Sequence, residues 1–216
     1  MRHVGEAGQE GAQVGGEGSE DLEGLVKTYE TTLKKMRRKP TEPDLLIGLG
    51  RLYWKRLENL EKAEGFYKRL KLIDSKSEAM LAFYVEYYRA RGNWKRLFTA
   101  QQNLFSVTER ASARLRIATE MAALAIDQLN KPEKAIDVWK QILRAQPGQS
   151  MARGELATLY RSTRKWNALL ELLKEDLNEP QTSDNQRIEI HLERVRIYRD
   201  ELRLDAMVVN SYLAIL

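Results

Sequence analysis

Two segments of this chain recur 72 residues further along. YRARGNWKRLF (88–98) is followed at that distance by YRSTRKWNALL (160–170), and EKAEGFYKRL (61–70) is followed by EKAIDVWKQI (133–142). An offset of this size is too long for one supersecondary unit, but half of it, about 36 residues, is the length of a helix-turn-helix repeat. The repeat therefore predicts a stack of helical hairpins, with two hairpins in each period.

The spacing of apolar residues and prolines supports this interpretation. Leu45, Leu49 and Leu52 lie three or four residues apart, as amphipathic helices require. Gly92 and Asn93 are typical of one helix ending and the next beginning, and Ser75 with Glu78 resembles a capping box. The five prolines all fall between the periodic segments, at Pro40, Pro43, Pro132, Pro147 and Pro180. We expect helices at 21–37, 43–57, 59–73, 76–91, 93–106, 110–129, 131–145, 149–163, 165–177, 185–202 and 204–216.

The first full repeat resembles the tetratricopeptide repeat (TPR) family. That family places a Leu-Gly pair and a Tyr on its first helix, then an Ala and an aromatic residue on its second. Here the corresponding residues are Leu49, Gly50, Tyr53, Ala63 and Tyr67. The resemblance covers about residues 22–216 and implies an all-α, right-handed α-solenoid of about five TPR-like helix-turn-helix repeats.

Alternate repeats depart from this pattern, because Trp94 and Trp166 stand where the second helix begins. The alternation resembles bacterial arrays that pair two repeat types. We expect both tryptophans to be packed in the core, where truncation to Ala would cost about 3–5 kcal/mol. The segment 53–70 also resembles the half-a-TPR repeats of RNA-processing scaffolds, which keeps a nucleic-acid-associated helical-repeat protein as an alternative.

The beginning of the chain differs in composition from the rest. Through Gly24 it has six acidic residues against Arg2, a net charge of −5, so the net +5 of the whole chain leaves +10 for the remainder. We expect residues 1–21 to be a disordered Gly/Glu-rich acidic tail, because such a segment buries too little apolar surface to order itself. Residues 22–216 then form one TPR-like superhelical domain. Since SYLAIL at the end has no polar cap, we expect this domain to continue beyond the fragment or to associate end to end with itself.

No pattern in the sequence indicates catalysis. The two histidines, His3 and His191, form no pair, and no phosphate-binding loop or nucleophile motif is present. We therefore expect a non-enzyme without cofactor or metal. The absence of Cys favours a reducing, cytoplasmic location, and residues 1–21 contain no apolar run that would insert into a membrane.

A protein-binding groove is the functional surface that the resemblance implies. In the TPR family the first helices of the repeats line a concave face, which suits an acidic or amphipathic peptide or helix of a partner protein. The basic run KKMRRK (34–39) complements a helix C-terminus, the interpretation we favour, or contacts nucleic acid or anionic lipid. The candidate groove residues are Arg51, Trp54, Lys55, Glu86, Arg89, Arg116, Ile126, Arg161, Arg196 and Arg199.

Overall fold

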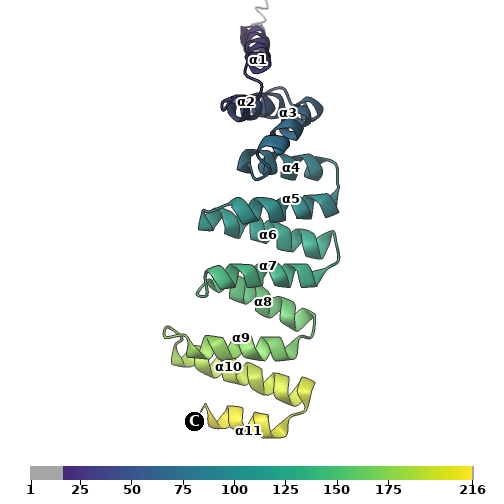
Figure 1. Cartoon of the computed structure of the whole chain (residues 1–216). Coiled ribbons are helices and arrows are strands. Elements are labelled where there is room, and N and C mark those ends of the chain that lie inside the picture. The colour runs from purple at the N-terminus through teal and green to yellow at the C-terminus, as the bar shows by residue number, and fades with distance from the viewer. Residues whose placement is uncertain (1–16, 216) are drawn as a thin grey trace, which may run out of the picture. The chain divides into compact units, whose positions relative to one another are not determined.

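The computed structural model describes residues 17–215, and these form helices with no strand. They divide into two compact units, one extending to Arg91 and the other beginning at Gly92 (Figure 1). The boundary lies between the expected helices 76–91 and 93–106. Most of the expected acidic tail, residues 1–16, lies outside the described residues.

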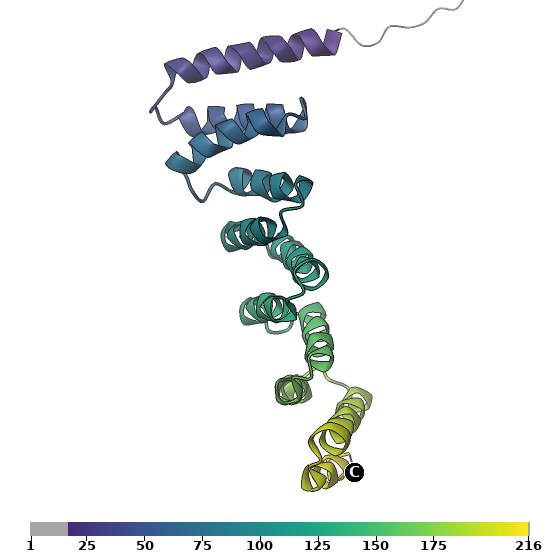
Figure 2. The same cartoon turned by 90° about the vertical axis from the view of Figure 1, so that its right-hand side faces the viewer.

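The first unit contains four helices, and the second of them is at its centre. This helix contacts the other three, and Figure 2 shows it lying antiparallel to the helix that follows it. The helices are α1 (Glu17–Lys35), α2 (Glu42–Lys55), α3 (Leu60–Ile73) and α4 (Glu78–Ala90).

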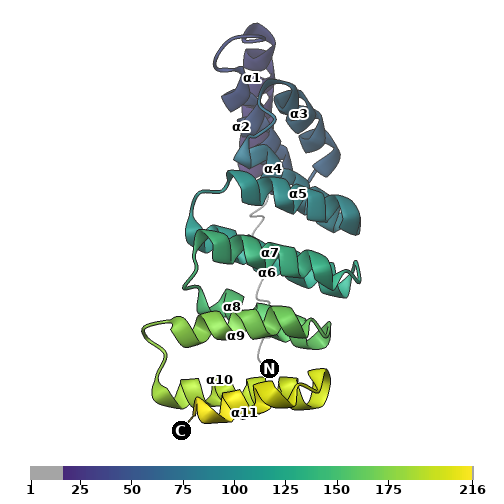
Figure 3. The same cartoon turned by 60° about the horizontal axis from the view of Figure 1, so that its bottom comes forward.

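The second unit is a chain of hairpins in which each helix contacts the next (Figure 3). Its helices are α5 (Trp94–Val107), α6 (Ala111–Asp127), α7 (Pro132–Ala145), α8 (Ser150–Ser162), α9 (Trp166–Asn178), α10 (Asp184–Arg196) and α11 (Asp205–Leu213). A short π-helix, η1 (Ile197–Leu202), continues α10.

The predicted order of helices is confirmed, and most bounds agree to within a few residues. Helix α1 begins at Glu17, earlier than the expected position near residue 21. The expected helix 185–202 divides into α10 and η1, and Arg203 has a left-handed backbone (φ 54) that ends it before α11.

The capping predictions had mixed outcomes. Gly92 has φ 61 and the Asn93 side chain accepts a hydrogen bond from the Arg96 amide at 3.2 Å, so this cap is confirmed. The predicted cap at Ser75 is wrong, because α4 begins later and Ser77 is its N-cap. The Ser77 hydroxyl accepts a hydrogen bond from the Met80 amide at 3.5 Å.

Stacked aromatic rings form the core of the first unit. The rings of Tyr67 on α3 and Phe83 on α4 stack with centroids 4.4 Å apart, and Trp54 on α2 meets both rings edge-on. Burial raises the pKa of Tyr67 to about 12. Gly50 on α2 makes this packing possible, because an added Cβ would lie 2.7 Å from the Tyr67 ring.

The second unit follows the same principle of small residues on one helix and large ones on the next. Ala118 and Ala125 on α6 are fully buried, and α6 packs against α7, where Trp139 is 1% exposed. Small side chains let two helices approach closely, and a large ring then fills the remaining space.

Trp94 and Trp166 are only half-buried, which corrects the expectation that they belong to the core. Each is the first residue of its helix, α5 or α9, so the two do occupy equivalent positions. A ring at the end of a hairpin keeps part of its surface in water. Truncating either residue to Ala should therefore cost less than the 3–5 kcal/mol of a buried aromatic.

The close approach of α2 and α3 at Gly50 can be tested with two substitutions in the first unit. Gly50→Ala should destabilise the protein by about 1–3 kcal/mol, because the new methyl group overlaps a buried ring. Gly65→Ala, on α3 with nothing within 4 Å of the added carbon, should stabilise it by about 0.5–1 kcal/mol through helix propensity. Urea unfolding followed by circular dichroism measures both changes, and equal effects from the two variants would contradict the packing argument.

Candidate partner-binding surfaces

The predicted groove residues fall into two sets, one in each unit. In the first unit Arg51, Trp54 and Lys55 lie on α2, and Glu86 and Arg89 lie on α4. In the second unit the predicted residues are Arg116 and Ile126 on α6, Arg161 on α8, Arg196 on α10 and Arg199 in η1.

A cavity of about 320 Å³ between α1 and α2 brings two of these residues together. Its cationic lining is Arg51, Lys55 and Arg56, and none of the described carboxylates lines it. The apolar part of the lining includes Leu25 and Tyr29 of α1. The cavity therefore combines positive charge with an apolar floor, and its other lining residues are Gly48 and Leu52.

Gly48 sets the distance between the two helices at this cavity. A Cβ at position 48 would lie 3.0 Å from Cε1 of Tyr29, so the aromatic ring rests close to the α2 backbone. The Tyr29 ring consequently forms a wall of the cavity. No sequence pattern indicated Leu25, Tyr29 or Arg56, because the cavity exists only where α1 lies against α2 and its C-terminal end.

The ring of Trp54, a predicted groove residue, packs at the edge of the aromatic core of the first unit. Its ring centroid lies 5.5 Å from that of Phe83 in the aromatic core, and the Lys55 ammonium covers the ring at 3.7 Å from its centroid. The side chain is half-buried. A Trp54→Ala change would therefore disturb the core of the first unit, and it is a poor test of binding.

Four of the predicted arginines already contact carboxylates of this chain. Arg116 pairs with Glu120 at 3.0 Å, and the Arg161 Nε donates to Glu193 at 2.7 Å, which joins α8 to α10. Arg89 pairs with Glu86, which was itself a predicted groove residue. The fourth pair is Arg199 with Asp200, whose pKa is lowered by its hydrogen bond to that guanidinium.

Three cationic candidates differ from these four, and one of them, Lys55, has its ammonium over the Trp54 ring. Within the described residues, Arg51 and Arg196 form no ion pair. Ile126, the apolar candidate, is 41% exposed on α6. Of the predicted set, only Arg51 and Lys55 thus share a cavity in which no carboxylate competes for them.

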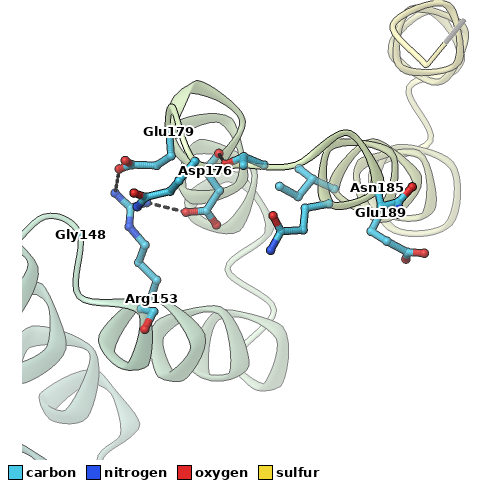
Figure 4. A pocket seen from close by; sticks show the side chains of 11 residues that line it. Gly148, Arg153, Asp176, Glu179, Asn185 and Glu189 are labelled. Carbon is cyan, nitrogen blue, oxygen red and sulfur yellow. Dashed lines mark hydrogen bonds and ion pairs between the residues drawn. The ribbon is translucent and has the colours of Figure 1, made fainter.

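A second cavity, of about 530 Å³, lies in the second unit and was not predicted (Figure 4). Arg153 of α8 forms one wall and is only 14% exposed. Its guanidinium donates to Asp176 at 2.6 Å and to Glu179 at 3.1 Å, and its Nε donates to the Pro147 carbonyl at 2.9 Å. These contacts fasten the end of α9 to the start of α8.

The polarity of this second cavity is opposite to that of the first. Three carboxylates, Asp176, Glu179 and Glu189, line it against the single guanidinium of Arg153, together with the Asn185 amide. Such a lining favours cations and hydrogen-bonding groups over anions. Asp176 and Glu179, two of the ion-pair partners of Arg153, lie 23 and 26 residues away in the chain, so no local pattern in the sequence indicated the cluster.

The described residues contain no group of three or more His, Asp or Glu placed to hold a metal ion. Within residues 17–215, no helix has both the length and the apolar character needed to cross a bilayer.

His191 on α10 is a half-buried histidine whose Nδ1 has no hydrogen-bond partner in the described part of the chain. Burial lowers its pKa below the ordinary value of 6.5, and the nearby charges of Arg194 and Arg187 lower the pKa further. The neutral imidazole is therefore the form that the fold favours.

This arrangement predicts a pH dependence of stability. The pKa of His191 is lower in the folded state than in the unfolded state. The contribution of the neutral imidazole to the free energy of unfolding is therefore complete above about pH 6.5 and is lost as pH falls below that value. His191→Gln should therefore show a smaller fall in melting temperature between about pH 7.5 and about pH 5.5 than the unmodified chain. His3 is present in both proteins and cancels; equal falls would show that His191 does not titrate differently on folding.

Comparison with known proteins reveals the fold but no relative in sequence. No family model matches the chain, and no curated protein does. The chain is similar to the crystal structure of a tetratricopeptide repeat protein from Parabacteroides merdae, at 16% identity and a TM-score of 0.50, over 92% of this chain and 73% of that one. It is also similar to the crystal structure of MamA, at 16% identity and a TM-score of 0.46, over 73% of this chain and 87% of that one. A third similar structure is that of YrrB, a TPR protein with an unusual peptide-binding site, at 10% identity and a TM-score of 0.46, over 86% of this chain and 93% of that one.

The helical hairpins and the structural similarity together define an all-α solenoid. Its fold is the TPR-like fold that the sequence pattern predicted.

Proposed function

We propose that this chain is a non-enzymatic protein-interaction scaffold that binds an acidic or amphipathic peptide or helix of a partner protein. The observation that carries the proposal is the α1–α2 cavity, where Arg51, Lys55 and Arg56 surround an apolar floor without a competing carboxylate. The TPR-like fold agrees with this function, because stacked helical hairpins present long surfaces to a guest.

Both parts of the cavity are needed for useful affinity. An ion pair on an exposed surface contributes only about 0.2–1 kcal/mol, so the cations alone would bind any anion weakly. An apolar side chain of the guest, placed against Leu25 and Tyr29, would add burial and exclude water from the ion pairs. An amphipathic helix with carboxylates beside an apolar stripe provides both kinds of group.

The predicted cations of the second unit suit this guest less well. A guest carboxylate at Arg161 or Arg116 would replace Glu193 or Glu120, so it would gain only the difference between two ion pairs. The specificity for acidic segments is therefore assigned to the first unit.

This proposal can be tested with a fluorescent amphipathic peptide of Glu and Leu residues. Arg51→Glu with Lys55→Glu should weaken its binding by about tenfold or more, because two attractive charges become repulsive beside the guest. Fluorescence anisotropy measures the change. The matched control is Arg116→Glu with Arg196→Glu, two arginines of the second unit, which should leave the affinity within about twofold.

Equal weakening by both double variants would show that binding depends only on total charge. The nucleic-acid alternative gives a different result, in which labelled RNA binds to the unmodified chain with an affinity that falls steeply as salt increases. Failure of the peptide to bind at all would reject the proposed function.

We further propose that the chain associates with itself through α11. Large apolar residues are exposed on or beside this helix, with Val209 56% and Leu213 62% exposed. Exposed apolar faces of this kind are typical of association surfaces. The other exposed apolar residues there are Leu204, Met207 and Tyr212.

Sedimentation velocity tests this association. The unmodified chain should show a sedimentation coefficient that rises with concentration, and Val209→Glu with Leu213→Glu should abolish the rise. Both positions are exposed, so circular dichroism should show unchanged helicity. If the unmodified chain remains monomeric at all concentrations, the proposed self-association through α11 is contradicted.

A further inference from the structure

The turn between α1 and α2 forms a basic cavity at the end of α3. This cavity has a volume of about 520 Å³ and is separate from the α1–α2 cavity described above. Arg37, Arg38 and Lys39 contribute its positive charge from the turn, and Arg69 contributes from α3. The remaining lining residues are Pro40, Glu42, Pro43, Leu72 and Ile73.

Among the residues that the structure describes, Glu42 contributes the only carboxylate of this lining, and it is already occupied. Glu42 is buried and accepts hydrogen bonds from the Arg38 backbone amide and from the Arg69 Nε, the latter at 2.6 Å. These contacts lower the pKa of Glu42, the Arg38 amide being the largest cause, so the carboxylate stays charged and holds the turn against α3. Glu42 thus balances Arg69 and closes the turn.

The charges of the turn remain available to a ligand. Within the described part of the chain, the side chains of Arg37, Arg38 and Lys39 form no ion pair, and all three are exposed. Helix α1 ends at Lys35, so Lys34 and Lys35 complement its C-terminus as the sequence analysis favoured. The three residues of the turn lie beyond the last helical residue, where the helix dipole does not account for them.

An aliphatic side chain projects beside these charges. Leu72 is 88% exposed and Ile73 is 49% exposed, both at the C-terminal end of α3. Because Leu72 is uncovered on nearly all sides, a flat protein surface would bury only part of it. A fluid apolar layer, into which the Leu72 side chain can insert, would surround that side chain completely.

We propose that this end of the first unit is a docking site for an anionic lipid surface. Phosphate and carboxylate headgroups would neutralise Arg37, Arg38 and Lys39, while Leu72 and Ile73 would enter the interfacial layer of the bilayer. Nucleic acid would use the cations but give the protruding Leu72 no apolar surroundings. Among the described residues, no aromatic side chain lines the cavity for base stacking.

Two weak interactions, electrostatic attraction and apolar insertion, would act together at an anionic lipid surface. Basic residues near an anionic leaflet attract it through a potential that salt screens, and a short apolar insertion adds a contribution that salt does not screen. The docking site is peripheral, and no membrane-spanning helix is involved. It is also independent of the peptide-binding function, because the two cavities share no lining residue.

Co-sedimentation with vesicles tests the proposal on the full chain. The unmodified protein should bind vesicles of phosphatidylcholine with about one-third phosphatidylserine and should not bind phosphatidylcholine alone. Arg37→Gln with Lys39→Gln should lower the partition coefficient by about 25-fold, at roughly fivefold per charge. Leu72→Ala should lower it by about tenfold, and this second loss should persist when salt is raised.

Matched controls come from the second unit. Ile188→Ala truncates another exposed aliphatic side chain, and Lys131→Gln with Lys140→Gln removes two exposed lysines; each should change the partition coefficient by less than about twofold. The proposal is overturned by failure to bind the anionic vesicles, or by binding that is insensitive to Leu72→Ala. Competition by single-stranded RNA that abolishes vesicle binding, together with indifference to Leu72, would identify a nucleic-acid surface instead.

Discussion

The packing of the Tyr67 ring against the α2 backbone at Gly50 supports the arrangement of the first unit. Without a side chain at position 50, α2 and α3 approach closely enough for Tyr67 to stack on Phe83, and α4 is thereby joined to the hairpin. In the second unit α6 and α7 pack through the same combination, with buried alanines on one helix and Trp139 on the other. Close helix approach therefore depends on which residues are small as much as on which are large.

This packing leaves the polar faces of the helices to determine function. In the first unit, two separate cavities present cations without free carboxylates, one with an apolar floor and one beside a projecting leucine. In the second unit, the cavity beside Arg153 has carboxylates in excess. The two units thus offer surfaces of different charge on the same kind of hairpin.

The candidate site could be predicted only in part, and the reasons are physical. Arg51, Trp54 and Lys55 were assigned to the groove because the TPR resemblance implies that the first helix of each repeat lines it. The ring of Trp54, however, turns toward Phe83 on α4, and no local pattern in the sequence specifies this contact between helices. The pairing of Arg161 with Glu193 could not be predicted from a local sequence pattern either, because 32 residues separate the two in the chain.

The sequence by itself determined the all-α class, the order of the hairpins and most helix bounds. These follow from local causes: apolar residues every three or four positions, prolines and glycines at the connections, and small residues opposite large ones. The tertiary structure alone decided which charges remain available, that Trp94 and Trp166 keep part of their surface in water, and that Tyr29 and Arg56 complete a cavity with Arg51. These properties depend on the distance between side chains of different helices, which no local pattern specifies.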